Sequence, residues 1–168
     1  MRLVFVVIVP FLIFYEMWPY SHKYQSQHGA IMSKSSISIL QNTQGMLNLT
    51  GEPVRADGWY GHSDGLHTVA IYLNNFQGRI YFEASIATQP IEEDWFPIPV
   101  DGGKYLSFPQ NPLAPTGNLG DSGTLGFNLI GNFTWLRVRV DRSYIVPEPT
   151  GRDQIDALGY VDRVLLNN

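Results

Sequence analysis

Residues 79–86 read RIYFEASI and residues 133–140 read FTWLRVRV, and these two stretches decide the fold. In each stretch, apolar side chains alternate with polar or amphipathic ones. The core-facing sets are Ile80, Phe82, Ala84 and Ile86 in the first stretch, and Thr134, Leu136, Val138 and Val140 in the second. Because successive side chains of a β-strand point to opposite faces, the alternation predicts two strands, each with one face in the core.

Each of these stretches follows another segment that is rich in β-branched and aromatic residues. Residues 67–73 (HTVAIYL) precede the first stretch, and residues 124–130 (TLGFNLI) precede the second across Gly131 and Asn132. Two strand-like runs joined by a short turn are typical of a β-hairpin. The sequence therefore predicts two hairpins, each built from neighbouring segments of the chain.

Shorter strand-like segments lie around these four, and no amphipathic helix of useful length is expected. The segments are residues 37–40, 46–49, 95–98, 104–108 and 161–166. Pro97 predicts that residues 95–98 form an edge strand, since proline cannot donate to a central ladder. The turn signal at residues 101–103 and the polar residues 147–156 separate further strands. Many short strands between turns predict an all-β fold, a single antiparallel β-sandwich of jelly-roll type over residues 36–168.

Composition limits the classes of function. The chain has 168 residues, enough for one domain, and it has no cysteine, so disulfides, thiolate nucleophiles and cysteine zinc sites are ruled out. A formal net charge of -4 disfavours nucleic acid as a partner, because phosphates need a basic face. Only 15% of residues are charged, below the about 25% of typical domains. Two interpretations remain: extensive subunit contacts, or an ordinary aromatic-rich β core.

Residues 1–31 differ from the rest of the chain. Residues 3–15 read LVFVVIVPFLIFY after Arg2, a run of signal-peptide length that is too short to cross a bilayer comfortably. Pro10 interrupts the run, and no clear cleavage site follows it. Residues 32–36 (MSKSS) resemble an ordinary protein start. Residues 1–31 are thus a signal or anchor, translated upstream sequence, or a genuine extension, and they are left outside the predicted domain.

Three groups of residues have the composition of a chemical site. Residues 120–123 (GDSG) match a serine-protease nucleophile motif, with His62 and Asp64 upstream, but the other protease segments are missing and a glycine-rich turn explains the motif. The weak metal candidates are His62, Asp64 and His67, with Asp57 close by in the sequence. Residues 92–94 (EED) could ligate calcium or form a solvated acidic loop. We expect no catalytic residue and no cofactor.

Large aromatic side chains provide the candidate binding residues. The candidate binding or interface residues are Trp59, Tyr60, Trp95, Phe96 and Tyr105. Together with Trp135, several of them could stack on sugars, and the same residue types are normal in protein interfaces and β cores. Residues 109–123 form a long loop rich in Pro, Gly and Asn, and its length predicts a functional or contact loop.

Residues 57–98 resemble small virion structural proteins of tailed phages, especially T4-like phages of marine bacteria. The resemblance is carried by residues 58–61 (GWYG), 64–69 (DGLHTV), 78–81 (GRIY), 84–90 (ASIATQP) and 94–96 (DWF), and it continues in residues 135–140 (WLRVRV). These motifs are patterns of strand and turn without a signature of chemistry. The resemblance implies a β-sandwich in the particle, at the neck, tail or capsid surface.

These observations lead to one expected function and one alternative. The expected function is a non-enzymatic structural or decoration protein of a virion, which binds other virion proteins and itself as a homo-oligomer through apolar and aromatic patches. The alternative is a secreted or surface carbohydrate-binding module that uses exposed Trp and Tyr. A membrane becomes a partner only if residues 1–31 are a real signal or anchor. An enzyme is not expected, because no acid–base constellation emerges.

Overall fold

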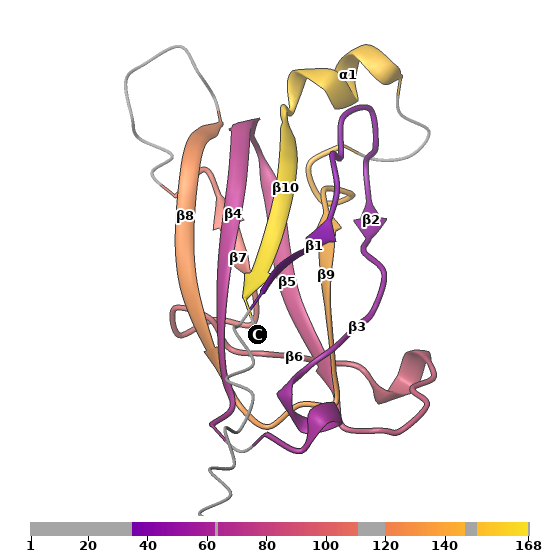
Figure 1. Cartoon of the computed structure of the whole chain (residues 1–168). Coiled ribbons are helices and arrows are strands. Elements are labelled where there is room, and N and C mark those ends of the chain that lie inside the picture. Colours follow the sequence, from indigo (N-terminus) through magenta and orange to yellow (C-terminus); the bar gives the residue numbers. More distant parts are fainter. Residues whose placement is uncertain (1–34, 63, 111–119, 147–150, 168) are drawn as a thin grey trace, which may run out of the picture. The chain divides into compact units, whose positions relative to one another are not determined.

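The computed structural model describes residues 35–62, 64–110, 120–146 and 151–167, and the predictions for residues 1–31 lie outside these ranges. The described chain is all-β and its strands are antiparallel. They form two sheets (Figure 1). The sequence prediction of an antiparallel all-β fold is therefore confirmed.

The first sheet, called sheet A, has the strand order β1-β10-β4-β8. Its strands are β1 (Ser36–Leu40), β10 (Tyr160–Asn167), β4 (Leu66–Phe76) and β8 (Asp121–Ile130). β4 and β10 are central, so their inward side chains are fully covered, and Val69, Ile71 and Val164 have no exposed area. β8 forms one edge of the sheet and pairs with β4 from Leu66↔Ile130 to Leu73↔Gly123.

The second sheet, sheet B, is built on β5 (Gly78–Ser85) and β9 (Trp135–Asp141), which pair from Arg79↔Asp141 to Ser85↔Trp135. Two-residue strands β2 (Leu49–Thr50) and β3 (Val54–Arg55) pair with β9. On the other side of the sheet, β6 (Phe96–Pro97) and β7 (Leu106–Phe108) both pair with β5. The predicted edge position of the Pro97 segment is thereby confirmed.

The inner faces of the two sheets share one hydrophobic core. Ile80, Phe82 and Ala84 of β5 lie opposite Val140, Val138 and Leu136 of β9, as the alternation predicted. Sheet A contributes Val69, Ile71, Leu73, Phe76, Leu129, Val161, Val164 and Leu166. Ile86 was expected on the core face, but β5 ends at Ser85 and Ile86 is 71% exposed.

Both predicted hairpins are wrong. β4 belongs to sheet A and β5 to sheet B, although only Gln77 separates them. β8 and β9 are likewise divided between the two sheets. The backbone turns sharply at the first crossing, where Asn75 has φ 46° and Gly78 has φ 149°, so the chain leaves one sheet and enters the other. Each short connection is therefore a link between sheets.

Short helices lie at the ends of the sheets. The 3₁₀ helices η1 (Asp57–Tyr60) and η2 (Glu92–Asp94) lie near the end where β5 finishes, and α1 (Arg152–Ala157) lies at the opposite end, directly before β10 (Figure 1). α1 falls in the segment predicted as a polar excursion without a helix. The expected turn at residues 101–103 is present, with Asp101 and Gly102 at positive φ between bridged Val100 and Gly103, but the next strand, β7, pairs with β5.

Candidate functional site

The outer face of sheet B carries a dense set of arginine and aromatic side chains. It follows from strand alternation: because alternate residues of β5 and β9 face the core, the residues between them face outward. We call this surface the Arg–aromatic face. It comprises Arg55, Trp59, Arg79, Tyr81, Glu83, Glu92, Trp95, Tyr105, Trp135, Arg137, Arg139 and Tyr144.

The centre of the Arg–aromatic face is the carboxylate of Glu83. Its Oε2 accepts a hydrogen bond of 2.8 Å from Nε of Arg137, and its Oε1 accepts one of 2.8 Å from Nε of Arg139. The side chains of Glu83 and Arg137 are each only 8% exposed. Charge-assisted hydrogen bonds of this length are roughly twice as strong as neutral ones, so this triad holds β5 and β9 rigidly together on the outer side of the sheet.

Arg137 also fixes η2 over the sheet. Its Nη1 and Nη2 donate to the two carboxylate oxygens of Glu92 at 2.9 Å and 2.7 Å. The guanidinium carbon lies 4.3 Å from the ring centroid of Trp95. The hydrogen bonds from Arg137 lower the pKa of Glu92, and the same contact with Glu92 raises the pKa of Arg137.

Toward the far end of the sheet, cations and rings alternate. Arg139 lies 3.9 Å from the ring of Tyr81, and Tyr81 lies 5.1 Å from Tyr105. Arg79 lies 4.6 Å from the ring of Tyr105 and 3.8 Å from that of Tyr144. Burial lowers the pKa of Arg79, but its electrostatic interactions with Tyr105, Tyr81 and Tyr144 and its hydrogen bond with Tyr81 raise it by more, so that the pKa lies above its ordinary value.

At the other end, two tryptophans, whose rings are tilted by 58° to each other, form a cluster with Arg55. The rings of Trp59 and Trp135 are 5.0 Å apart, and the Arg55 guanidinium lies 4.3 Å from Trp59 and 5.9 Å from Trp135. Nε1 of Trp135 donates to the carbonyl of Thr88 at 3.3 Å. η1 brings Trp59 here, because Gly58 N donates to the carbonyl of Phe133, close to the start of β9.

The predicted interface residues divide between this face and other places. Trp59, Trp95 and Tyr105 lie on the Arg–aromatic face, as described above. Tyr60 is 56% exposed in η1, with its ring 6.2 Å from His62. Phe96 pairs with inward-facing Ala84 and contacts the ring of Phe133 edge-on at 6.2 Å, so it belongs to the core margin.

Sequence reasoning missed the arginines and Glu83 as members of a site. The signal was present in the outward positions of the two alternating strands. The outward positions of residues 79–83 and 135–139 carry Arg, Tyr, Glu and Trp, whereas Ser85 and Phe133, which the alternation also puts on the outer side, are buried. Their mutual contacts depend on the register between β5 and β9, which the predicted hairpins did not include.

The weak metal candidates are not brought together. His67 is fully buried in β4, its Nε2 lies 3.2 Å from the carbonyl of Gly131, and its ring stacks on Phe133. His62 and Asp64 are exposed. Asp57, also named with this group, is buried in η1. Over the described ranges, no three His, Cys, Asp or Glu side chains are placed to hold a metal ion.

The remaining motifs have structural roles. Ser122 Oγ accepts a hydrogen bond from Asn75 N at 2.8 Å, and Asp121 Oδ2 accepts one from Gln110 N at 2.7 Å. Leu66, two residues after Asp64, pairs with Ile130, and Ser122 lies eight residues from Ile130 along β8, roughly 27 Å away, so His62 and Asp64 stand near the opposite end of that strand. In the acidic segment 92–94, Glu92 binds Arg137 and Asp94 accepts from Ile91 N, so two of the three carboxylates serve the fold.

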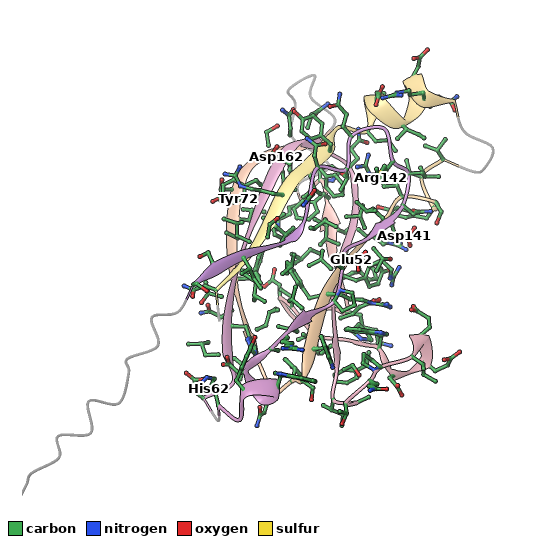
Figure 2. All side chains as sticks on the ribbon, turned by 45° about the vertical axis from the view of Figure 1, so that its right-hand side comes forward. Glu52, His62, Tyr72, Asp141, Arg142 and Asp162 are labelled. Carbon is green, nitrogen blue, oxygen red and sulfur yellow. The ribbon has the colours of Figure 1, made fainter. Side chains whose placement is uncertain are left out.

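A fully buried arginine lies outside the Arg–aromatic face. Arg142 Nη1 donates to the carbonyl of Gly159 at 2.8 Å and Nη2 to Thr43 Oγ1 at 3.0 Å. Burial lowers the pKa of Arg142 to about 10. Figure 2 places Arg142 and His62 at opposite ends of the sheets. Because Thr43 Oγ1 also accepts from Val161 N, Arg142 joins the chain after β9 to the start of β10.

Comparison with known proteins finds no matching family model, no matching curated protein and no matching solved structure. In the part of the chain that the structure describes, none of the helices has the length and apolar character needed to cross a bilayer.

Proposed function

We propose that this chain is a non-enzymatic structural or decoration protein of a tailed-phage virion, which assembles with other virion proteins through the Arg–aromatic face. The observation that carries the proposal is the composition of that face. Binding hot spots of protein interfaces are enriched in Trp, Tyr and Arg, and interface cores are depleted in Lys and Ser. Arg55, Arg79, Arg137 and Arg139 all lie among its tryptophan and tyrosine rings.

The rigidity of the face supports the same role. Glu83 and Glu92 fix Arg137 through both carboxylates, and Glu83 also fixes Arg139. Side chains that are already held in place lose little conformational entropy on binding, and preorganisation of this kind favours a stable contact. The exposed rings of Tyr105 (38%) and Tyr144 (46%) remain available to a partner at one end of the face.

We further propose that the fold is of jelly-roll type. The chain crosses repeatedly between the sheets, for example from β3 to β4, from β4 to β5 and from β7 through β8 and β9 to β10, giving the orders β1-β10-β4-β8 and β2-β9-β5-β6. This alternation supports a pair of interleaved Greek keys, the arrangement of jelly rolls, which occur in viral capsid and lectin domains. Because a fold hosts many functions, the fold alone does not select the virion role.

Arginine side chains cover one side of two tryptophan rings, and this favours a protein partner over a sugar. Stacking on a sugar needs an open ring face, whereas Arg55 covers Trp59 at 4.3 Å and Arg137 covers Trp95 at 4.3 Å. Both guanidiniums would have to move before a sugar could use those sides of the rings. The carbohydrate-binding alternative therefore ranks second.

Mass spectrometry of purified phage particles tests whether the chain is part of the virion. Incorporation of tagged variants into those particles tests whether the Arg–aromatic face is the contact surface. Arg79→Ala combined with Tyr105→Ala is expected to lower incorporation at least tenfold. Arg163→Ala is the matched control, because Arg163 also covers a tyrosine ring, that of Tyr72 at 4.2 Å, but on sheet A. Absence of the chain from particles, or micromolar binding on a glycan array by a monomer, would overturn the proposal.

A further inference from the structure

The four strand edges of the described sheets differ in how they are protected. An unprotected edge strand presents unpaired N–H and C=O groups to any other extended chain, and proteins usually blunt edges with short strands, prolines, charges or bulges. Sheet B ends in the two-residue strands β2 and β3 on one side, and in β6, which contains Pro97, and the three-residue β7 on the other.

The β1 edge of sheet A is also protected. β1 has five residues, and its pairing with β10 is interrupted by a bulge between Ser38 and Leu40. Gly51 lies against this edge so closely that a Cβ atom there would collide with the carbonyl oxygen of Ile39. Another strand therefore has little room to add beside β1.

β8, the fourth edge, has none of these protections from Gly123 to Ile130, because its charged residue, Asp121, and its register shift against β4 both lie at the start of the strand. It runs for 10 residues, from Asp121 to Ile130, and contains no proline, lysine or arginine. It pairs regularly with β4 from Gly123 to Ile130, so this part of the edge is not broken by a bulge. Among the described residues, no strand pairs with its other side. Long, regular and uncharged edges of this kind are templates for strand addition.

The inward side chains of β8 are less well covered than those of the neighbouring strand β4. Leu125 and Phe127 point to the core but are only half-buried, whereas Val69 and Ile71, their partners in β4, have no exposed area. On the outer side, Ile130 is 76% exposed. A strand added beside β8 would satisfy the backbone groups and cover Leu125 and Phe127 with its own inward side chains.

The single charge of β8 decides the direction in which a second copy would pair with it. Asp121 is the only charged residue of the strand and stands at its first position. Antiparallel pairing of two copies keeps the two Asp121 carboxylates roughly 30 Å apart, while parallel pairing places them side by side, where like charges repel. Antiparallel pairing about a twofold axis also uses each β8 edge once, so the assembly closes as a dimer and does not grow into a fibre.

We infer that two copies of this chain join β8 to β8 in antiparallel fashion, making one continuous sheet from the two A sheets. The inference does not depend on the proposed virion role, because β8 belongs to the sheet that does not carry the Arg–aromatic face. A particle partner could bind sheet B whether or not the β8 edges are paired.

Analytical ultracentrifugation of the full chain tests the inference. The native chain is expected to have twice the 19.0 kDa mass of one copy at micromolar concentration. Leu125→Lys places a charge at the new contact and is expected to weaken dimerisation at least tenfold, while Arg79→Ala is expected to leave it unchanged. A native chain that stays monomeric at all concentrations, or a dimer that Arg79→Ala dissociates and Leu125→Lys does not, overturns the inference.

Single cysteines give an independent measurement if Leu125→Lys fails to fold. The chain has no cysteine, so each introduced thiol is unique. Thr124→Cys, Gly126→Cys and Asn128→Cys lie on the exposed outer side of β8, and Ser36→Cys on the β1 edge is the matched control. Disulfide dimers are expected at the β8 position nearest the twofold axis and to decline on either side of it. Equal cross-linking at Ser36→Cys, or none along β8, contradicts the pairing.

Discussion

Arg137 on β9 and Glu92 on η2 are joined by two parallel hydrogen bonds of 2.9 Å and 2.7 Å, so one guanidinium fixes a surface helix to the centre of a sheet. Arg137 is nearly buried, while the Glu92 side chain is 76% exposed. Because a guanidinium stays charged at ordinary pH, Glu92 is the group that titrates in this contact, and its carboxyl group makes the contact depend on pH.

Glu92→Gln is expected to lower the melting temperature above about pH 5 and to lose this effect at lower pH. The contact with Arg137 lowers the pKa of Glu92 below its ordinary value of 4.5 in the folded chain. A carboxyl group whose pKa is lowered by folding stabilises the fold above its unfolded pKa, and this contribution disappears as the pH falls through the folded pKa. Thermal unfolding of both proteins between pH 3 and pH 7 measures the difference. Glu93→Gln is the neighbouring control, and an equal effect of the two substitutions would contradict the assignment.

Glu83→Ala is expected to lower the free energy of unfolding by about 2–3 kcal/mol, below the roughly 3–5 kcal/mol lost when a fully buried pair is broken. The substitution leaves Nε of Arg137 and Nε of Arg139 without their acceptor, but Arg137 retains Glu92 and Arg139 is 32% exposed. Urea denaturation provides the measurement. Asp162→Ala removes an exposed pair with Arg163 and should cost less than about 1 kcal/mol. If both substitutions cost the same, the Glu83 triad does not hold the two strands together.

Arg142→Lys is expected to destabilise the fold by about 2–4 kcal/mol and Arg142→Met by less, because lysine keeps a buried charge without the planar fork of arginine. The fork reaches Gly159 O and Thr43 Oγ1 at the same time, and its guanidinium carbon lies 4.8 Å from the ring centroid of Phe76. Methionine retains the apolar stem and removes the desolvated charge. Chemical denaturation at neutral pH gives the order of the two variants, and a lysine variant as stable as the native chain would contradict this account.

Gly159→Ala is expected to destabilise the chain much more than Gly61→Ala. Both glycines have positive φ, 64° and 74°, which costs an alanine about 1–2 kcal/mol. A Cβ at Gly61 meets nothing within 4 Å, whereas one at Gly159 collides with the carbonyl oxygens of Asn74 and Asn75. The difference between the two variants in denaturation experiments therefore measures the collision alone. Equal losses of unfolding free energy in the two variants would mean that the backbone around Gly159 shifts easily to make room for the Cβ atom.

The sequence predicted the strands well because alternation is a local property. The inward residues of β5 and β9 were identified correctly from Ile80 to Ala84 and from Leu136 to Val140. Alternation does not reveal which strands are neighbours. Gln77 between β4 and β5 resembles the turn of a hairpin, yet the chain crosses there from one sheet to the other.

The candidate site was predicted only in part for the same reason. Trp59, Trp95 and Tyr105 were predicted as binding or interface residues, because large aromatic side chains can be recognised from the sequence alone. The contact between Arg139 and Tyr81 arises because these residues are direct partners in the β5–β9 ladder. That register joins residues 58 positions apart, and the predicted hairpins did not include it.

The position of β10 has a consequence for how the protein is made. β10 follows every other strand along the chain, yet it is inserted between β1 and β4, two strands that are synthesised long before it. Until residues 160–167 leave the ribosome, β1 has no neighbour in sheet A and the edge of β4 opposite β8 stays unpaired. A message truncated before the codon for Tyr160 should therefore yield a chain that chaperones retain and proteases remove, even though it contains most of the hydrophobic residues.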